Sequence, residues 1–319
     1  MTRYALGRLP GALATLVLAS IVIFSLLRLV PGDPAAALAG PDATEETLAA
    51  IRHELGLDRP FLLQYVSWLG GVFTLDLGRS YIIGGEIGAL VRAGLLNTAV
   101  LALSAMLIAI VLAFTAALLA VVVDRPWINA ILTGANTAGL AIPTYVTGLV
   151  LVVVLAVLVP ILPAGGTPPA GLFAQPDVTA QYVLMPALCL ALPLSAAIAR
   201  FLTEALRTEL SQPYVTTARA VGISRRRIIV IQALPNAVPA ALTVMGLQFG
   251  ALLGGAVLVE AIFAWPGLGQ LIEQAISGRD YPVVQVMMLV SVGVFIVVQL
   301  VTDVVHAAVD PRIRLGAEA

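Results

Sequence analysis

The stretch "YVTTARAVGISRRRIIVIQALPN", residues 214–236, differs more from its surroundings than any other part of the chain. It holds four arginines within nine positions, in a protein of 319 residues that is 60% hydrophobic and only 11% charged. Long apolar runs lie on both sides of it, and a bilayer core needs about 20 apolar residues of helix. We therefore expect this cationic segment to connect two membrane-spanning helices.

Composition indicates that lipid is the solvent for much of the chain. The mean hydropathy of +1.02 is too high for an ordinary soluble domain. All 17 basic residues are arginine, which excludes a P-loop ATPase and Schiff-base chemistry within this chain, because both need a lysine. The single cysteine, Cys189, excludes an intrachain disulfide, and its apolar neighbours predict a small buried side chain.

Six stretches are long and apolar enough to span a bilayer, which predicts an all-α membrane protein with six transmembrane helices. They lie at about 9–27, 98–123, 131–158, 182–199, 237–259 and 283–301. The first is read as an uncleaved anchor, because about 19 apolar residues exceed the usual 7–15 of a signal peptide. We expect two regions: an anchor with an extracytoplasmic segment at 1–93, and a five-helix core at 94–319.

Arginine bias predicts that both termini are cytoplasmic. With the N-terminus inside, most arginines fall in cytoplasmic segments, whereas acids outnumber arginines in the outside segment 32–93. Trp68, Trp127 and Trp265 lie outside the spans or at their edges, where interfacial indoles are expected.

The outside segment predicts two short helices. "DATEETLAAIRHELGL" is typical of an amphipathic helix with an acidic first turn, and "RPFLLQYVSWLGGVF" is interfacial in character and too short to span. His53 lies beside Glu54, but the chain has only one other histidine, so a metal site is disfavoured.

The membrane cores lack the groups that would power transport or catalysis. Spans two to four contain no Asp, Glu, Arg or His, and Glu260 and Asp303 lie just past the ends of spans five and six. Ion-coupled carriers keep such residues at membrane depth, and no Ser/His or paired-Asp constellation suits a hydrolase. We therefore expect a non-enzymatic pathway powered from outside the chain.

Polar lining within the spans is modest. Each candidate can equally form a helix–helix hydrogen bond in a packed bundle. Gly246 and Gly250 form a small-xxx-small pair that lets helices approach closely. The candidates for pathway lining are Thr144, Thr147, Thr243 and Gln248.

The cytoplasmic segment 200–236 predicts two short helices lying at an angle along the membrane surface. Ser211 is expected to cap a helix at 213–221, and Gly222 to end it in the positive-φ conformation. Ser224 is expected to cap a second helix from 225 to about 233, before Pro235 interrupts.

The first of these helices has a shallow profile suited to a groove on another protein. Tyr214, Ala218 and Val221 fall near one stripe, while Thr216, Thr217 and Ala220 are small. The alternative for Arg225–Arg227 is that they only enforce orientation and meet anionic lipid.

The stretch resembles the EAA loop of ABC-importer permeases. Ala218, Gly222, Leu234 and Pro235 match at the right spacing; Thr216, Thr217 and Gln232 depart from the generic pattern and agree with the peptide/nickel branch. The segments "LRLVPGDPAAAL", "LGLDRPFLLQYVSWLGG", "DLGRSY", "VEAIFAWPGLGQLIEQAISGRDYPVVQ" and "VDPRIR" resemble the same branch, so nearly the whole chain is covered.

This resemblance implies the type I importer fold in the bacterial inner membrane and assigns roles to two sets of residues. Residues 211–235 would couple the chain to ATPase subunits, and the turn after span five would lie near the mouth where a solute-binding protein docks. The coupling residues are Tyr214, Thr216, Thr217, Ala218, Arg219, Ala220, Gly222, Leu234 and Pro235. The extracytoplasmic residues are Glu260, Trp265, Pro266, Gly267 and Gly269; without the resemblance, an interfacial tryptophan before a Pro-Gly reversal would explain that turn.

The resemblance also implies partners and cargo. The partners would be a second permease subunit, two ATPases that bind ATP and magnesium, and a solute-binding protein, with no cofactor in this chain. Short peptides are the expected cargo; nickel, glutathione, opines and haem-like solutes remain alternatives. An ion-driven secondary carrier is a remote third reading.

Overall fold

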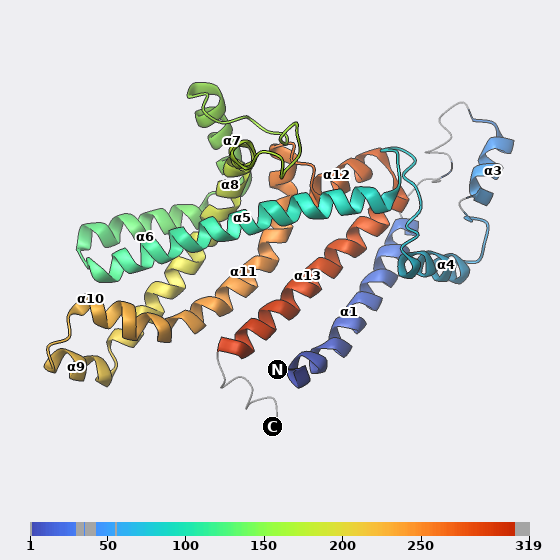
Figure 1. Ribbon diagram of the computed structural model, residues 1–319. Helices are drawn as coiled ribbons and strands as arrows, with labels where there is room; N and C mark the ends of the chain where they lie inside the picture. Colours follow the sequence, from blue (N-terminus) through green and yellow to red (C-terminus); the bar gives the residue numbers. More distant parts are fainter. Residues whose placement is uncertain (1, 30–34, 36–42, 55, 310–319) are drawn as a thin grey trace. The chain divides into compact units, whose positions relative to one another are not determined.

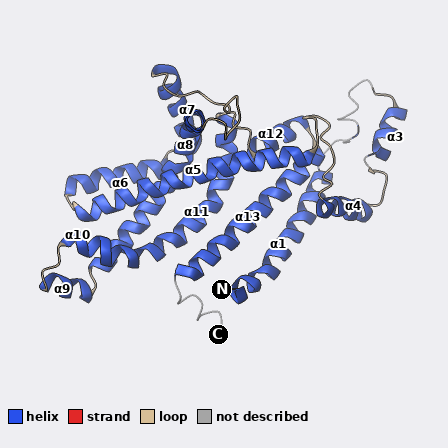
Figure 2. Cartoon of the chain, viewed as in Figure 1, coloured by secondary structure: helices blue, strands red, loops and turns tan. Residues whose placement is uncertain are grey.

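The computed structural model describes residues 2–29, 35, 43–54 and 56–309. The regular elements in these ranges are helices, as the composition predicts (Figure 2). In chain order they are α1 Thr2–Leu29, α3 Glu45–Glu54, α4 Phe61–Thr74, α5 Ile87–Val122, α6 Pro126–Ala141, α7 Thr144–Val152, the π-helical η1 Val153–Leu158, α8 Pro176–Leu210, α9 Pro213–Ala220, α10 Arg225–Arg227, the π-helical η2 Ile228–Ala233, α11 Leu234–Ile262, α12 Leu268–Gly278 and α13 Tyr281–Val309.

Five helices in the described part are long and apolar enough to cross a membrane, and there are six if a bent pair counts as one span. The five lie within α1, α5, α8, α10–α11 and α13, and the bent pair is α6 with α7–η1. The predicted six spans correspond to the higher of these counts.

The third predicted span is broken. We expected one stretch at about 131–158, but α6 and α7–η1 meet at an angle of 104°. Ile142 has an extended backbone, with φ −77° and ψ 122°, and Pro143 follows it. A proline disfavours the helical conformation of the residue before it, because its ring crowds that residue's backbone.

The described chain forms two compact units. The first contains the start of α1 up to residue 7, residues 99–265 and the end of α13 from residue 297, and the second contains residues 8–98 and 266–296. In the first unit, α8 packs against α6, α7 and α11 (Figure 1). Cys189 on α8 is fully buried, as predicted, and its thiol lies 3.1 Å from the carbonyl oxygen of Thr144.

Small residues allow close helix packing in the first unit. Ala105, Ala109, Ala113 and Ala117 recur every four residues on α5 and are completely buried. Such a stripe lets neighbouring backbones approach. The predicted close approach at Gly246 is also present, because a Cβ there would overlap the side chain of Thr302 on α13.

The second unit has its own apolar core. The N-terminal end of α5 meets α12 and the start of α13, with Ile87, Leu268, Val283 and Met287 buried among them. Two predicted short helices also lie here: α3 begins with Glu45 and Glu46, and α4 follows it. His53 at the end of α3 contacts Asp58, with 2.8 Å between Nδ1 and Oδ2.

Candidate functional site

The first helix of the predicted coupling segment, α9, begins at Pro213 as predicted, but its N-cap lies one residue later than the predicted Ser211. Pro213 occupies the first turn, where a missing N–H costs nothing, and Gln212 is the N-cap. Ser211 does not cap this helix. It lies at the C-terminal end of α8, and its hydroxyl donates to the carbonyl of Thr208 at 2.7 Å.

The end of α9 confirms the prediction for Gly222. Its φ is +84°, a region that glycine adopts without steric cost. The Gly222 N–H donates to the carbonyl of Arg219, and the Ile223 N–H donates to that of Ala218, both at 3.0 Å. Ile223 also packs near Ala218 in one apolar cluster. These bonds form a Schellman motif, which satisfies the last carbonyls of the helix.

The two faces of α9 differ sharply. Val215 and Ala218 are buried against Ile228, whereas the opposite face is open. Val221, expected near one stripe with Tyr214 and Ala218, is 71% exposed; it is the C-cap, where the chain leaves the helix. The exposed residues of the face are Thr216, Thr217, Arg219 and Ala220.

Tyr214 points toward the rest of the unit. Its hydroxyl donates to a carboxylate oxygen of Glu209 at 2.9 Å, which links α9 to the end of α8. Burial raises the pKa of Tyr214, and Glu209 adds to the shift by favouring the protonated hydroxyl. Of the predicted coupling residues, Tyr214 and Ala218 therefore support α9 from inside.

The second predicted helix is not a separate one. Ser224 occupies the N-cap position without a side-chain cap bond, and the helix then runs continuously from Arg225 to Ile262. Leu234 and Pro235 lie inside it rather than at its end. The expected interruption at Pro235 is therefore wrong: the first turns after Ser224 are the start of a membrane-spanning helix.

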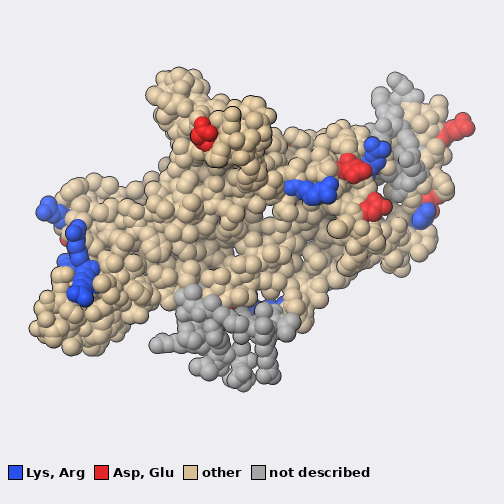
Figure 3. Space-filling model, in the orientation of Figure 1, with Lys and Arg blue, Asp and Glu red and all other residues tan. Residues whose placement is uncertain are grey.

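The three consecutive arginines have different environments. Arg225 donates from one guanidinium nitrogen to Asp124 Oδ2 at 2.7 Å and to the carbonyl of Val121 at 3.1 Å, so it covers the C-terminal end of α5. Arg226 and Arg227 are exposed and form no ion pair with the residues that the structure describes. The hydrogen bond from Arg225 lowers the pKa of Asp124. Arginine side chains gather around α9 and α10 (Figure 3).

The predicted extracytoplasmic turn begins in the first unit with two buried side chains. Trp265 is completely buried in the apolar cluster to which α5, α8 and α11 contribute. The expectation that its indole lies at the membrane interface is therefore wrong. Glu260 lies inside α11 rather than past its end and is also fully buried. The chain closes tightly here: Ala264 has φ +47°, and the Trp265 N–H donates to the carbonyl of Glu260 at 2.8 Å.

The turn continues in the second unit, where two polar side chains of α5 fix it. The Asn97 amide donates to the carbonyl of Pro266 at 2.8 Å. The hydroxyl of Thr98 accepts from the Leu268 N–H at 2.9 Å, which satisfies one of the free donors in the first turn of α12. Gly267 precedes α12 and Gly269 lies in its first turn; both are buried. Their place near a binding protein remains a prediction.

Asp280, between α12 and α13, is a further buried polar residue that our sequence interpretation did not single out. One carboxylate oxygen accepts from the Ser80 hydroxyl at 2.6 Å and from the Ile82 N–H at 3.0 Å. The carboxylate therefore holds the loop before α5 onto the start of α13. The sequence signal was an acidic residue between Gly278 and Pro282, at a helix junction.

The predicted lining residues lie on two helices that contact each other, α7 and α11. Thr144, Thr147 and Gln248 are half-buried, and Thr243 is exposed. The Thr243 hydroxyl donates within its own helix, to the carbonyl of Pro239 at 3.2 Å. Gly148 on α7 lies beside Ile262, at the C-terminal end of α11, and the pathway role of the four residues remains a prediction.

Comparison with known proteins identifies the family to which this chain is similar. Residues 109–315 match the family model described as "Binding-protein-dependent transport system inner membrane component", and residues 1–89 match its N-terminal counterpart. The glutathione transport system permease protein GsiC of Salmonella choleraesuis (strain SC-B67) is 33% identical over 98% of this chain and 99% of its own length. GsiC of Escherichia coli (strain K12) gives the same identity and coverage.

A solved structure supports the fold. A chain of the MetNI methionine ABC transporter, in an inward-facing conformation, superposes with a TM-score of 0.58 at 19% identity, covering 69% of this chain and 96% of that one. Together with the apolar helices, these matches show that this chain belongs to the binding-protein-dependent inner membrane component family and is a multi-pass permease subunit of an ABC importer with the type I fold, in the peptide/nickel branch.

Proposed function

We propose that this permease subunit forms half of the translocation pathway for short peptides and that α9 couples it to the ATPase subunits of the importer. The observation that carries the coupling assignment is the outer face of α9. This face is small and exposed, and the helix behind it is fixed by an apolar cluster and by the Gly222 turn. A rigid, shallow helix can enter a groove on a partner without reorganising.

The contacts of α9 and its neighbours indicate how a displacement of α9 would be transmitted to the membrane-spanning helices. Tyr214 links α9 to α8, and Arg225 links the start of the next helix to the end of α5. Because the helix is continuous from Arg225 to Ile262, displacement of α9 reaches α11 through only a four-residue turn, 221–224. The partner ATPases would supply the energy by binding and hydrolysing ATP with magnesium, and this chain would perform no catalysis.

Gly222→Val tests the coupling role. A β-branched residue at φ +84° is strained, so the turn must change. In the complete importer, reconstituted with its second permease subunit, two ATPases and binding protein, we expect ATP-driven uptake to fall at least tenfold. Gly222→Asn should retain most uptake, because asparagine tolerates this conformation better.

Gly171→Val is the matched control. Gly171 also has a positive φ, +91°, with open space around it, but it lies in the loop before α8. Uptake and ATPase co-purification should remain near normal in this variant. Normal uptake and assembly in Gly222→Val would refute the coupling assignment.

Relatives named as glutathione transport permeases support a peptide-like cargo, since glutathione is a tripeptide, and they support the glutathione alternative equally. Calorimetric titration of the partner binding protein with di-, tri- and tetrapeptides, glutathione, nickel and haem tests it. Tight binding of several short peptides supports the proposal, whereas selective binding of glutathione, nickel or haem overturns it in favour of that alternative. Uptake by this chain alone under an ion gradient, without ATP, would favour a secondary carrier instead.

A further inference from the structure

The helix α4 carries an apolar face that no part of the described chain covers. Leu62, Leu63, Val66 and Phe73 are between 59% and 80% exposed. At 100° per residue they fall within one sector of about 100° on the helix surface. They therefore form a continuous stripe, which we call the outer stripe of α4.

The opposite part of α4 is packed against α1. The ring of Phe24 lies 5.3 Å from that of Phe61 and 5.5 Å from those of Tyr65 and Trp68, measured between centroids. The Tyr65 hydroxyl lies 2.8 Å from that of Ser20. The position of α4 along α1 is thus fixed by aromatic packing and one polar contact.

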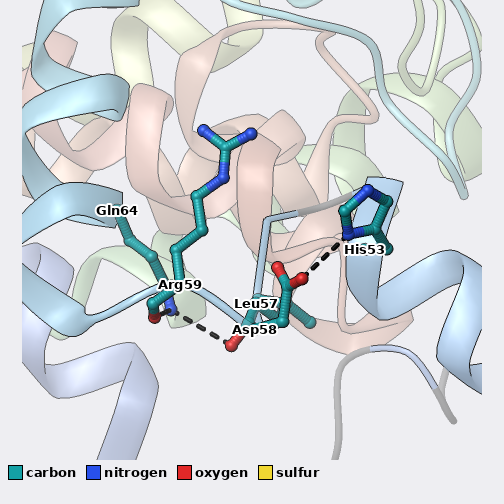
Figure 4. Close-up of polar contacts among 5 residues, drawn as sticks. All are labelled: His53, Leu57, Asp58, Arg59 and Gln64. Carbon is teal, nitrogen blue, oxygen red and sulfur yellow. Dashed lines mark hydrogen bonds and ion pairs between the residues drawn. The ribbon is translucent and has the colours of Figure 1, made fainter.

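The amide side chain of α4, Gln64, is turned away from the outer stripe. The Gln64 amide donates to the carbonyls of Leu57 at 3.2 Å and Arg59 at 2.6 Å, on the turn that follows α3 (Figure 4). The Thr74 hydroxyl donates to the carbonyl of Gly70 within the helix. No residue from 60 to 75 is charged. The stripe can therefore be buried in an apolar medium without desolvating a charged side chain.

The residues of α1 that contact α4 indicate how deep α4 lies in the membrane. The apolar span of α1 covers Gly7–Leu26, and its side chains Leu13, Leu18 and Val22 are exposed as lipid-facing residues are. Ser20 and Phe24 lie six and two residues before Leu26, or about 9 and 3 Å at 1.5 Å per residue. Helices that lie in the membrane interface are buried by about 5–10 Å. At about 21 Å, α4 is too short to cross a core of about 30 Å.

We propose that α4 is an interfacial membrane helix, whose outer stripe is embedded in the lipid leaflet at the C-terminal end of α1. The stripe is exposed and uncharged and lies beside the end of an apolar membrane span, and that position identifies the occupant as lipid acyl chains. The helix would anchor the segment between α1 and α5 at a constant depth, close to the charged residues Arg59 and Asp76 that bracket it. This proposal does not depend on the cargo or on the coupling role of α9.

Nitroxide labelling of the complete importer in phosphatidylcholine nanodiscs tests the proposal. Single cysteines would replace Leu62, Val66 and Phe73 in a Cys189→Ala background, with Leu18→Cys as the lipid reference and Glu46→Cys as the water reference. Accessibility to oxygen and to a water-soluble nickel chelate would be measured by power saturation. We expect the three α4 labels to favour oxygen, as Leu18→Cys does, at depths within about 10 Å of the headgroups.

Two outcomes would overturn the proposal. Accessibility to the nickel chelate equal to that at Glu46→Cys would place the stripe in water. Low accessibility to both reagents, relieved when the binding protein or the second permease subunit is omitted, would identify a protein partner instead.

A matched pair of substitutions keeps the test independent of labelling. Val66→Arg places a charge in the outer stripe, whereas Ser67→Arg places it on the neighbouring polar side. We expect Val66→Arg alone to lower the melting temperature in nanodiscs, with a smaller loss in detergent micelles, where headgroups can rearrange around the charge. Equal melting temperatures for the two variants in nanodiscs would contradict the proposal.

Discussion

At Pro143 the chain turns sharply, whereas at Pro235 it stays helical. Our sequence interpretation expected the reverse: a continuous third span, and an interruption at 235. The backbone before each proline shows the difference. Ile142 is extended, while Leu234 has helical angles of −59° and −48°. Proline lacks the N–H that would bond to the carbonyl four residues before it, and its ring crowds that carbonyl.

A wider helix relieves this crowding before Pro235. In η2 the hydrogen bonds reach five residues back, as from the Leu234 N–H to the Ile229 carbonyl. Widening alone does not preserve a helix, however. The π-helical η1 also precedes a proline, Pro160, yet the helix there ends at Leu158.

Burial separates the two outcomes. Ile229, Ala233, Ala237 and Ala241 form a buried stripe that continues on both sides of Pro235. By contrast, α6 and η1 bury no residue completely, and α7 buries only Gly148. A proline in a helix interior costs about 3 kcal/mol; side-chain packing on both sides can offset the part that widening leaves, and where packing is missing the chain bends.

Pro143→Ala should produce the largest change. Alanine is favoured over proline by about 3 kcal/mol in a helix interior, so α6 and α7 should gain a continuous-helix population. Spin labels at Thr133 and Val157 would lie about 36 Å apart in a straight helix, and we expect double electron–electron resonance to show a longer distance than in the parent. Pro126→Ala, in the first turn of α6, is the control and should change nothing. An unchanged distance in Pro143→Ala would show that packing onto α8, rather than the proline, sets the bend.

Ala237→Leu tests the packing that preserves the helix at Pro235. Ala237 is 1% exposed, and added carbons in a filled core cost about 1–3 kcal/mol. We expect a lower melting temperature and faster amide exchange at 231–236. Ala240→Leu is the matched control, because Ala240 is exposed in the same turn region. Equal melting temperatures for the two variants would contradict the burial explanation.

Local signals were sufficient for several parts of the fold. The end of α9 at Gly222 could be predicted, because a helix end with positive φ depends on a single residue and its hydrogen bonds. The α3 helix followed from its acidic first turn, and the burial of Cys189 from its apolar neighbours. These features are determined within a few residues of the sequence.

Features that depend on distant residues could not be predicted. Nothing in "SRRR" distinguishes Arg225 from its neighbours, because its partner Asp124 lies 101 residues earlier in the chain. Trp265 was assigned to the interface from its place beside a span, yet the surrounding helices bury it completely. The effect of a proline likewise depends on what packs against the helix on either side.

Pro235→Ala should have a smaller effect than either variant above. The widened η2 has already relieved the crowding, so restoring one N–H should raise stability by less than about 1 kcal/mol. We expect a melting temperature within a few degrees of the parent. A large rise would mean that Pro235 is strained in the native helix, and that the buried stripe alone keeps the helix intact.

The smallest effect is expected at the start of the same helix, where Arg225 contacts Asp124. Both side chains are about half exposed, and exposed pairs contribute only about 0.2–1 kcal/mol after screening by solvent. Arg225→Ala should lower stability within this range, while Arg226→Ala, its exposed neighbour, should change it less. The pKa of Asp124 is below its ordinary value of 3.8, so the contribution is present above that value and is lost as the pH falls through the lowered pKa. The difference between the two variants should therefore shrink in melts below about pH 4 and also at high salt, since salt screens exposed charges. A difference that persists in both conditions would show that Arg225 acts mainly through its bond to the Val121 carbonyl, which carries no titratable charge.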